Sequence, residues 1–184
     1  MDLTNSYAIV AYVAGPIAGF VDRLRRDLEP GCQHLAHITF LPPRPLLRGT
    51  PAEAIEFARP LVAQFEPFQV RMGSVEAFCD SQVIYLSIAA GACELTAMHD
   101  VLNTGILEQP EVFHYVPHLT LCQQLPVLPW DQVLEDYRRR WRECGVSSPL
   151  RIEAVTFVQQ RADGVWVDLA ELGLGRVPAV LKSR

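Results

Sequence analysis

The amino-acid sequence predicts an α+β fold built from two similar lobes, and three observations support this. Short β-branched and apolar runs alternate with segments of helical periodicity along most of the chain. The order strand, helix, strand, helix, strand occurs over residues 7–78 and again over residues 83–160. In both series the middle strand carries a His-x-Thr sequence, at His37 and at His118. We interpret this as an internal duplication, which predicts two lobes related by a pseudo-two-fold axis.

The first series begins with a β-branched and aromatic run at residues 7–13, which is typical of a strand. Gly15-Pro16 ends that run and starts a helix, since proline is favoured in the first helical turn. The first His strand follows at about residues 33–41. Thr50 then predicts the N-cap of a helix that continues to about residue 64. A strand at residues 68–78 completes the series.

The second series repeats this order after a short turn at residues 79–82, which predicts a β-hairpin between the two series. Its elements are, in order, a strand at 83–89, a helix at 94–107, the second His strand at 113–122, a helix at 131–144, and a final hairpin of strands at 150–160 and 165–169. In both series about thirty residues separate the start of the opening strand from the His, which supports the duplication.

The length of 184 residues fits one domain, 1–184, with lobe one at about residues 5–79 and lobe two at about 82–171. The net charge of −5 argues against a protein that holds long nucleic acid by bulk electrostatic attraction. It leaves room for a small phosphate ligand, because such a ligand needs only a local group of hydrogen-bond donors.

The N-terminus lacks the positive region of a signal peptide, and the apolar run at 7–14 is too short to span a bilayer. We therefore expect a monomeric, cytoplasmic protein that does not bind membranes. The five cysteines are scattered and form no Cys-x-x-Cys pair, which predicts free, mostly buried thiols rather than a disulfide framework or a zinc cluster.

The two His-x-Thr segments are the main functional signal in the chain. Because side chains of a strand alternate between its faces, each His shares a face with the Thr two residues later. If the two strands face one cleft, that cleft holds two imidazoles and two hydroxyls. Imidazole has a pKa of about 6.5, so one ring can act as a base and the other as an acid on either side of a phosphorus atom. The hydroxyls can donate hydrogen bonds to the remaining phosphate oxygens.

This pair of motifs resembles that of the 2H phosphoesterase superfamily, which includes bacterial 2′-5′ RNA ligase-like proteins and cyclic nucleotide phosphodiesterases. The segments His37-Ile38-Thr39-Phe40 and His118-Leu119-Thr120-Leu121 match its pattern of His, any residue, Thr or Ser, and an apolar residue. The order of elements extends the resemblance over about residues 5–171. The resemblance implies a bilobal fold with antiparallel sheets around a central groove that the four motif residues line.

The resemblance also implies an enzyme: a phosphodiesterase that acts, without a metal or cofactor, on 2′,3′-cyclic phosphate or 2′-5′ phosphodiester bonds of nucleotides or RNA ends. In that reading His37 and His118 are the acid–base pair, and Thr39 and Thr120 bind the phosphate. The sequence leaves open which His is the base, whether ligation or hydrolysis is the physiological direction, and which nucleotide is the substrate.

Three alternatives remain open from the sequence. A non-catalytic module would hold a nucleotide or an RNA end in the same groove without converting it. In the second alternative the two histidines are purely structural: both are half-buried strand residues bonded to backbone groups, and the protein has an interaction role. Histidines on adjacent strands can also hold zinc, although neither motif has Cys, Asp or Glu beside its His.

Three residues outside the motifs are candidate substrate contacts. Arg44 lies just past the first motif and would reach a phosphate, although an ordinary solvated arginine is the favoured alternative. Tyr115 has the strand parity to stack a base near the second motif. Arg161 follows the strand that ends at residue 160 and would close one end of the groove.

The other histidines give weaker signals. His34 falls on the face opposite His37, so we expect it at the edge of the core. His99 lies between two apolar positions of a predicted helix, which favours a packing role. His114 shares strand parity with His118 and is a candidate for the groove, unless Pro117 bends the strand between them.

Overall fold

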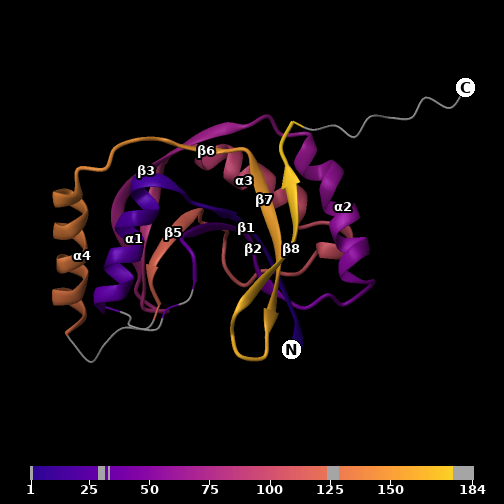
Figure 1. The fold of residues 1–184 in the computed structure, drawn as a ribbon, viewed down its shortest axis with the longest axis horizontal. Helices are drawn as coiled ribbons and strands as arrows, with labels where there is room; N and C mark the ends of the chain where they lie inside the picture. Colours follow the sequence, from indigo (N-terminus) through magenta and orange to yellow (C-terminus); the bar gives the residue numbers. More distant parts are fainter. Residues whose placement is uncertain (1, 29–31, 33, 124–128, 176–184) are drawn as a thin grey trace, which may run out of the picture.

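In the computed structural model the described residues, 2–28, 32, 34–123 and 129–175, form one curled eight-stranded sheet and four α-helices (Figure 1). The two ends of the predicted domain 1–184 therefore lie partly outside the described residues. All seven pairs of neighbouring strands are antiparallel. The predicted α+β class with an antiparallel sheet is confirmed.

The elements follow the predicted order. The first series is β1 (Leu3–Tyr12), α1 (Gly15–Leu28), β2 (His37–Arg44), α2 (Pro51–Ala63) and β3 (Phe68–Phe78). The second is β4 (Val83–Ala90), α3 (Ala92–Leu102), the 3-10 helix η1 (Gly105–Leu107), β5 (His118–Cys122), α4 (Trp130–Cys144), β6 (Leu150–Ile152) and β7 (Ala154–Arg161), and β8 (Trp166–Gly173) completes the last hairpin. Thr50 caps α2 as predicted, in a reciprocal capping box with Glu53.

Several boundaries differ from the prediction. β1 begins at Leu3 rather than residue 7, β8 extends to Gly173, and the strand expected at 150–160 is divided into β6 and β7. Both His strands begin at the histidine itself, later than the expected starts at about residues 33 and 113. Before β5 the chain forms a loop, because Pro117 has no N–H to give to a strand ladder. The predicted helix at 94–107 ends at Leu102 and resumes as η1. At Gly105 the backbone φ is +56°, and a Cβ would lie 2.5 Å from the ring of Phe57, so the chain turns there on a glycine.

The strand order is β6-β3-β4-β5-β2-β1-β7-β8, which places the two His strands side by side at the centre. The two halves of the sheet are not consecutive stretches of the chain. β3, from the first series, pairs with β4, and β7, from the second series, pairs with β1. The predicted lobes at 5–79 and 82–171 thus describe the repeat of elements along the chain, whereas the sheet exchanges the third strand of each series.

The helices cover one face of the sheet. Buried side chains from all four helices join those of the strands in one apolar core, which includes Phe20 of α1, Val62 of α2, Leu102 of α3 and Tyr137 of α4. Among the described residues, the other face has a small apolar cluster of Ala8, Val10 and Val158 with Trp166. One face of the sheet is therefore left open for a groove. No helix within the described residues is both long and apolar enough to cross a membrane.

All five cysteines are free thiols, as predicted. The expectation that they are mostly buried is wrong, since Cys32, Cys79 and Cys93 are exposed.

Candidate active site

The alternation of each His strand separates its polar residues from the core. Ile38 and Leu119 are fully buried against the helices, whereas His37, Thr39, His118 and Thr120 are half-buried on the other face. The apolar residues thus anchor each strand and direct the motif side chains to the open face of the sheet.

The register between β2 and β5 brings the two motifs together. Ile38 pairs with Leu119, so antiparallel pairing places His37 across from Thr120 and Thr39 across from His118. His37 and His118 become diagonal neighbours, whose Cα atoms lie about 7–8 Å apart in antiparallel sheets. The register thus brings both imidazoles to one region of the open face.

Both imidazoles are held by the same local hydrogen bond. Nδ1 of His37 lies 2.7 Å from the backbone oxygen of Leu35, and Nδ1 of His118 lies 2.6 Å from the backbone oxygen of Val116. Because a carbonyl oxygen can only accept, each Nδ1 must carry the proton. In the neutral state each Nε2 is then left with a lone pair that can accept a proton.

Burial lowers the pKa of both histidines below the ordinary value of 6.5, because it penalises the charged ring. The backbone hydrogen bond at Nδ1 opposes this shift in each case. The positive charge of Arg25 lowers the pKa of His37 further, as do His34 and His118. His118 has no such charged neighbour among the causes of its shift, so the two rings are alike in geometry but unlike in electrostatics.

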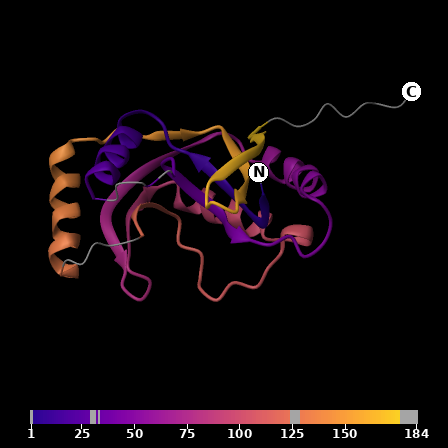
Figure 2. The ribbon, with the colours of Figure 1, turned by 60° about the horizontal axis from the view of Figure 1, so that its bottom comes forward.

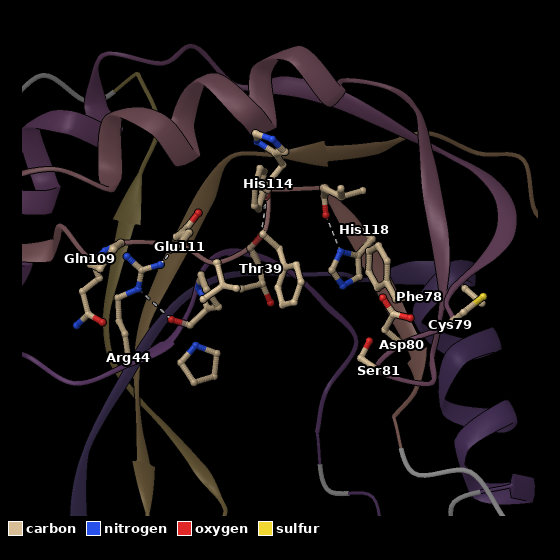
Figure 3. A pocket seen from close by; sticks show the side chains of 18 residues that line it. Thr39, Arg44, Phe78, Cys79, Asp80, Ser81, Gln109, Glu111, His114 and His118 are labelled. Carbon is tan, nitrogen blue, oxygen red and sulfur yellow. Dashed lines mark hydrogen bonds and ion pairs between the residues drawn. The ribbon is translucent and has the colours of Figure 1, made fainter.

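A pocket of about 820 Å³ opens beside the motifs (Figure 3). His118 and Thr39 line it, together with the end of β2, the turn after β3 and the loop between η1 and β5. Figure 2 shows that loop passing on the same side of the sheet as the turn between β3 and β4. The volume falls in the range of about 300–1,000 Å³ that is usual for small-molecule sites.

Comparison with known proteins agrees with the fold and places the chain in a family. The model of the 2′-5′ RNA ligase superfamily matches residues 13–164. The chain belongs to the 2′-5′ RNA ligase superfamily. This confirms the resemblance to 2H phosphoesterases and supports a phosphoesterase-type activity.

Individual members of the superfamily show how far the similarity extends. A provisionally named phosphoesterase of Bacillus cereus is 25% identical over 177 residues, which cover 91% of this chain and 96% of that protein. One of Bacillus cytotoxicus is 28% identical over 125 residues, 64% of this chain and 69% of that protein. The crystal structure of Escherichia coli LigT with NADP+ has a TM-score of 0.62 at 14% identity and covers 96% of this chain and 100% of that one. The structural match supports the fold alone.

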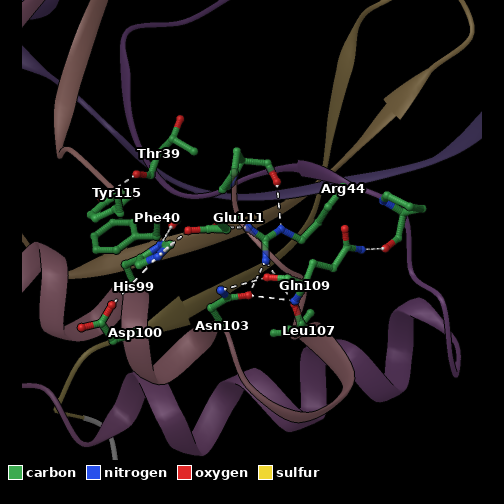
Figure 4. A network of polar contacts seen from close by, with 12 residues as sticks. Thr39, Phe40, Arg44, His99, Asp100, Asn103, Leu107, Gln109, Glu111 and Tyr115 are labelled. Atoms are coloured by element: carbon green, nitrogen blue, oxygen red, sulfur yellow. Dashed lines mark hydrogen bonds and ion pairs between the residues drawn. The ribbon is translucent and has the colours of Figure 1, made fainter. Parts of the chain in front are cut away.

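Arg44, a predicted phosphate contact, is buried in a network of internal contacts (Figure 4). Its guanidinium donates to the backbone oxygens of Pro42 and Leu107, to Oδ1 of Asn103 at 2.7 Å, and to Oε1 of Glu111 at 2.6 Å. These bonds use four of its five N–H donors. Arg44 lines the pocket but is committed to holding the loop before β5, which disfavours the expected phosphate contact.

Tyr115, the predicted base-stacking residue, also lines the pocket and is likewise held from within. Its ring stacks on His99 with the centroids 4.0 Å apart and the planes at 1°. Its hydroxyl donates to the backbone oxygen of Thr39. Burial raises the pKa of the phenol, and the carboxylates of Glu111 and Asp100 raise it further, so the hydroxyl keeps its proton. A contact between Tyr115 and a base stays a prediction.

Arg161 is not among the residues that line the pocket. It pairs with Leu3 near the start of β1, whereas His37 pairs with Tyr12 at the other end of that strand. The two positions are thus about nine residues apart along β1, roughly 30 Å. Arg161 instead forms an ion pair of 2.5 Å with Asp163 in the last hairpin.

Of the other histidines, His34 is exposed rather than at the core edge, and His114 is exposed and lines the pocket. His99 is buried, but in a polar network instead of simple apolar packing. Its Nδ1 lies 2.7 Å from the backbone oxygen of Phe40, and its Nε2 lies 3.0 Å from Oε2 of Glu111.

Two aromatic residues beside the motif were not predicted. Phe78 and Tyr85 stack with centroids 4.2 Å apart, and both rings approach His118 to within 5.2 Å. The signal was present in the sequence: Tyr85 and Phe78 flank the predicted hairpin turn. Tyr85 pairs with Thr120 across β4 and β5, so it shares the open face of the sheet.

Proposed function

We propose that the chain is a metal-independent phosphodiesterase that opens 2′,3′-cyclic phosphates or cleaves 2′-5′ bonds of nucleotides or RNA ends. The observation that supports this most strongly is the arrangement of the two imidazoles. They are diagonal neighbours with matched Nδ1 bonds, and each leaves Nε2 for the substrate. Each has a Thr hydroxyl on the neighbouring strand.

In the proposed reaction one neutral imidazole accepts a proton from the attacking water at Nε2. The water oxygen forms a bond to phosphorus while the bond to the leaving ribose oxygen breaks. The second imidazole, protonated at the start, gives its Nε2 proton to that leaving oxygen. The Thr39 and Thr120 hydroxyls donate to the non-bridging oxygens, where negative charge builds up. The reaction ends with a phosphomonoester and with the two rings in exchanged protonation states.

A turnover assay with adenosine 2′,3′-cyclic phosphate in excess EDTA tests this proposal. We expect activity in chelator, and a loss of at least about 100-fold in kcat for His37→Ala and for His118→Ala, the usual contribution of general acid–base catalysis. Thr39→Val and Thr120→Val should lose activity, whereas the matched Thr→Ser variants keep the hydroxyl and most of the rate. Full activity in either His variant would refute the pairing. Binding of adenosine 2′-phosphate without any turnover would support the non-catalytic module instead.

Within the described residues, no group of three His, Cys, Asp or Glu side chains is placed to hold a metal ion. Turnover in excess EDTA tests whether the reaction proceeds without a metal ion.

A further inference from the structure

The charges around the pocket beside His118 and Thr39 are mostly acidic. Among the described residues that line it, three besides the histidines carry a formal charge: Arg44, Asp80 and Glu111. Arg44 and Glu111 form an ion pair of 2.6 Å and offset each other. Asp80 is exposed in the turn after β3, and none of the described contacts pairs it with a cation. The lining thus has a net charge of −1 when its histidines are neutral.

Cationic donors for a second phosphate are scarce. Four of the five N–H donors of Arg44 are already used, and its side chain is 6% exposed. The chain contains a single lysine, Lys182, which lies outside the described residues. Polyphosphate sites normally gather several arginines or lysines, and the described lining offers one arginine that is engaged elsewhere.

The motif itself has a positive neighbour. The Arg25 guanidinium of α1 is buried and donates to the backbone oxygens of His34 at 2.6 Å and Thr120 at 2.8 Å. Its positive charge lowers the pKa of His37, which lies opposite Thr120 on the neighbouring strand. An anion at the motif is therefore close to the positive charge that acts on His37, whereas an anion near Asp80 meets a like charge.

The remaining lining is apolar and aromatic. Phe78 stands beside His118, and the loop before β5 exposes Val112, Phe113 and Val116, with 90%, 79% and 43% of their surface accessible. Apolar and aromatic side chains of this kind provide surface for the flat face of a nucleobase. The pocket is joined to the motif through His118 and Thr39, so a group attached to a phosphate at the motif extends into it.

We propose that this pocket receives the uncharged nucleoside of a substrate with one phosphodiester, and that Asp80 disfavours a second phosphate, which Arg44 does not bind because Glu111 already engages it. The inference rests on the proposed function, because it assumes that a phosphodiester binds at the motif. It places small 2′,3′-cyclic mononucleotides ahead of 5′-phosphorylated ones.

The test compares adenosine 2′,3′-cyclic phosphate with its 5′-phosphorylated counterpart as substrates of the wild-type chain. We expect kcat/KM to be on the order of tenfold lower for the 5′-phosphorylated compound, since Asp80 is exposed and water and salt weaken its repulsion of a second phosphate. Asp80→Asn should reduce this preference, and Asp80→Lys should abolish or reverse it. Asp163→Asn, a carboxylate of the last hairpin far from the pocket, is the matched control and should leave the preference unchanged.

A binding measurement separates this inference from the proposed function. Calorimetry compares adenosine 2′-phosphate with adenosine 2′,5′-bisphosphate, each without turnover. Preference for the monophosphate that weakens in Asp80→Lys supports the inference even when no turnover is seen. Equal or better binding and turnover of the doubly phosphorylated compounds overturns it, and leaves the phosphodiesterase proposal standing.

Discussion

The hydroxyl of Tyr115 donates a hydrogen bond of 2.8 Å to the backbone oxygen of Thr39. The next carbonyl along the strand, that of Phe40, is bonded to Nδ1 of His99, on whose ring Tyr115 stacks. Two side chains, one from the loop before β5 and one from α3, therefore hold the backbone of β2 at the first motif (Figure 4). The second motif strand is held at Thr120 by a different group, the guanidinium of Arg25.

Removing the Tyr115 hydroxyl should weaken catalysis more than binding. Tyr115→Phe keeps the stack on His99 but frees the backbone oxygen of Thr39, whose hydroxyl is proposed to stabilise the transition state. We expect kcat to fall by about fivefold, equivalent to about 1 kcal/mol, with little change in KM. Steady-state kinetics with a cyclic nucleotide measure this.

Tyr7→Phe is the control for a general loss of stability. It removes a buried hydroxyl that accepts a hydrogen bond from Gln159, and it should keep kcat. A rise in KM alone would contradict a positioning role.

Glu111 contacts two groups behind the pocket, Arg44 and His99. It lies 2.6 Å from Arg44 and 3.0 Å from His99, and Arg44 is buried. Glu111→Gln leaves that arginine without its counter-charge, so we expect a loss of about 2 kcal/mol in the free energy of unfolding, the low end for a buried pair because Glu111 is 22% exposed. Urea unfolding measures the loss.

An exposed ion pair provides the control for the Glu111 prediction. Glu143 pairs with Arg139 on the surface of α4, so Glu143→Gln should leave the free energy of unfolding nearly unchanged. Hydrogen exchange should also show faster opening of the loop before β5 in Glu111→Gln alone. Equal losses in the two variants would show that the buried network does not stabilise the fold.

Local patterns were sufficient to predict where the four motif residues lie. Strand parity placed His37 and Thr39 on the open face, and the duplication predicted that His118 and Thr120 meet them there. The predicted hairpin at residues 68–89 also required β3 to pair with β4. That pairing crosses the predicted lobe boundary, whereas the pairing of β7 with β1 was not predicted.

Non-local contacts explain what the sequence did not predict. Arg44 was expected to be a solvated residue or a phosphate contact, yet it is enclosed by Asn103 and Glu111, which lie 59 and 67 residues away. No periodicity within one element reports such a contact. Tyr115 was placed on a strand by parity, but the chain there is a loop, and its hydroxyl is directed by a bond to Thr39 rather than by strand alternation.

The pH dependence of turnover should reflect the lowered pKa of both histidines. One ring must be neutral and the other protonated, and burial lowers the pKa of both below 6.5. Activity should therefore be highest at mildly acidic pH, below about 6.5, and should fall at higher pH as the acid loses its proton. A profile of kcat/KM against pH measures this, and an optimum at pH 8 or above would contradict it.

The free energy of unfolding should decrease as the pH falls below about 6.5, because both histidines have a lowered pKa in the folded chain. Because the folded pKa of each histidine lies below the unfolded value of about 6.5, the unfolded chain takes up protons first as the pH falls. The contribution of the two neutral histidines to stability is complete above about pH 6.5. It is lost as the pH falls from there through the pKa values of the two rings in the folded chain. Urea unfolding at about pH 7.5 and about pH 5.5 should show lower stability at the acidic value. The double variant His37→Gln/His118→Gln should show a smaller difference, and an unchanged difference would rule out these two rings as its source.

A substitution of Arg25 tests whether a charged neighbour lowers the pKa of His37 but not that of His118. Its charge lowers the pKa of His37, whereas burial is the only cause that lowers the pKa of His118. Arg25→Met removes the charge and keeps much of the side-chain volume, so the pKa of His37 should rise and that of His118 should stay in place. Titration of the ring protons by NMR reports each histidine separately.

The buried guanidinium of Arg25 also donates hydrogen bonds to the backbone oxygens of His34 and Thr120, so some loss of stability accompanies the change. Equal shifts at both rings would show that the variant altered the burial of the whole groove, and no shift at His37 would show that Arg25 does not act on it.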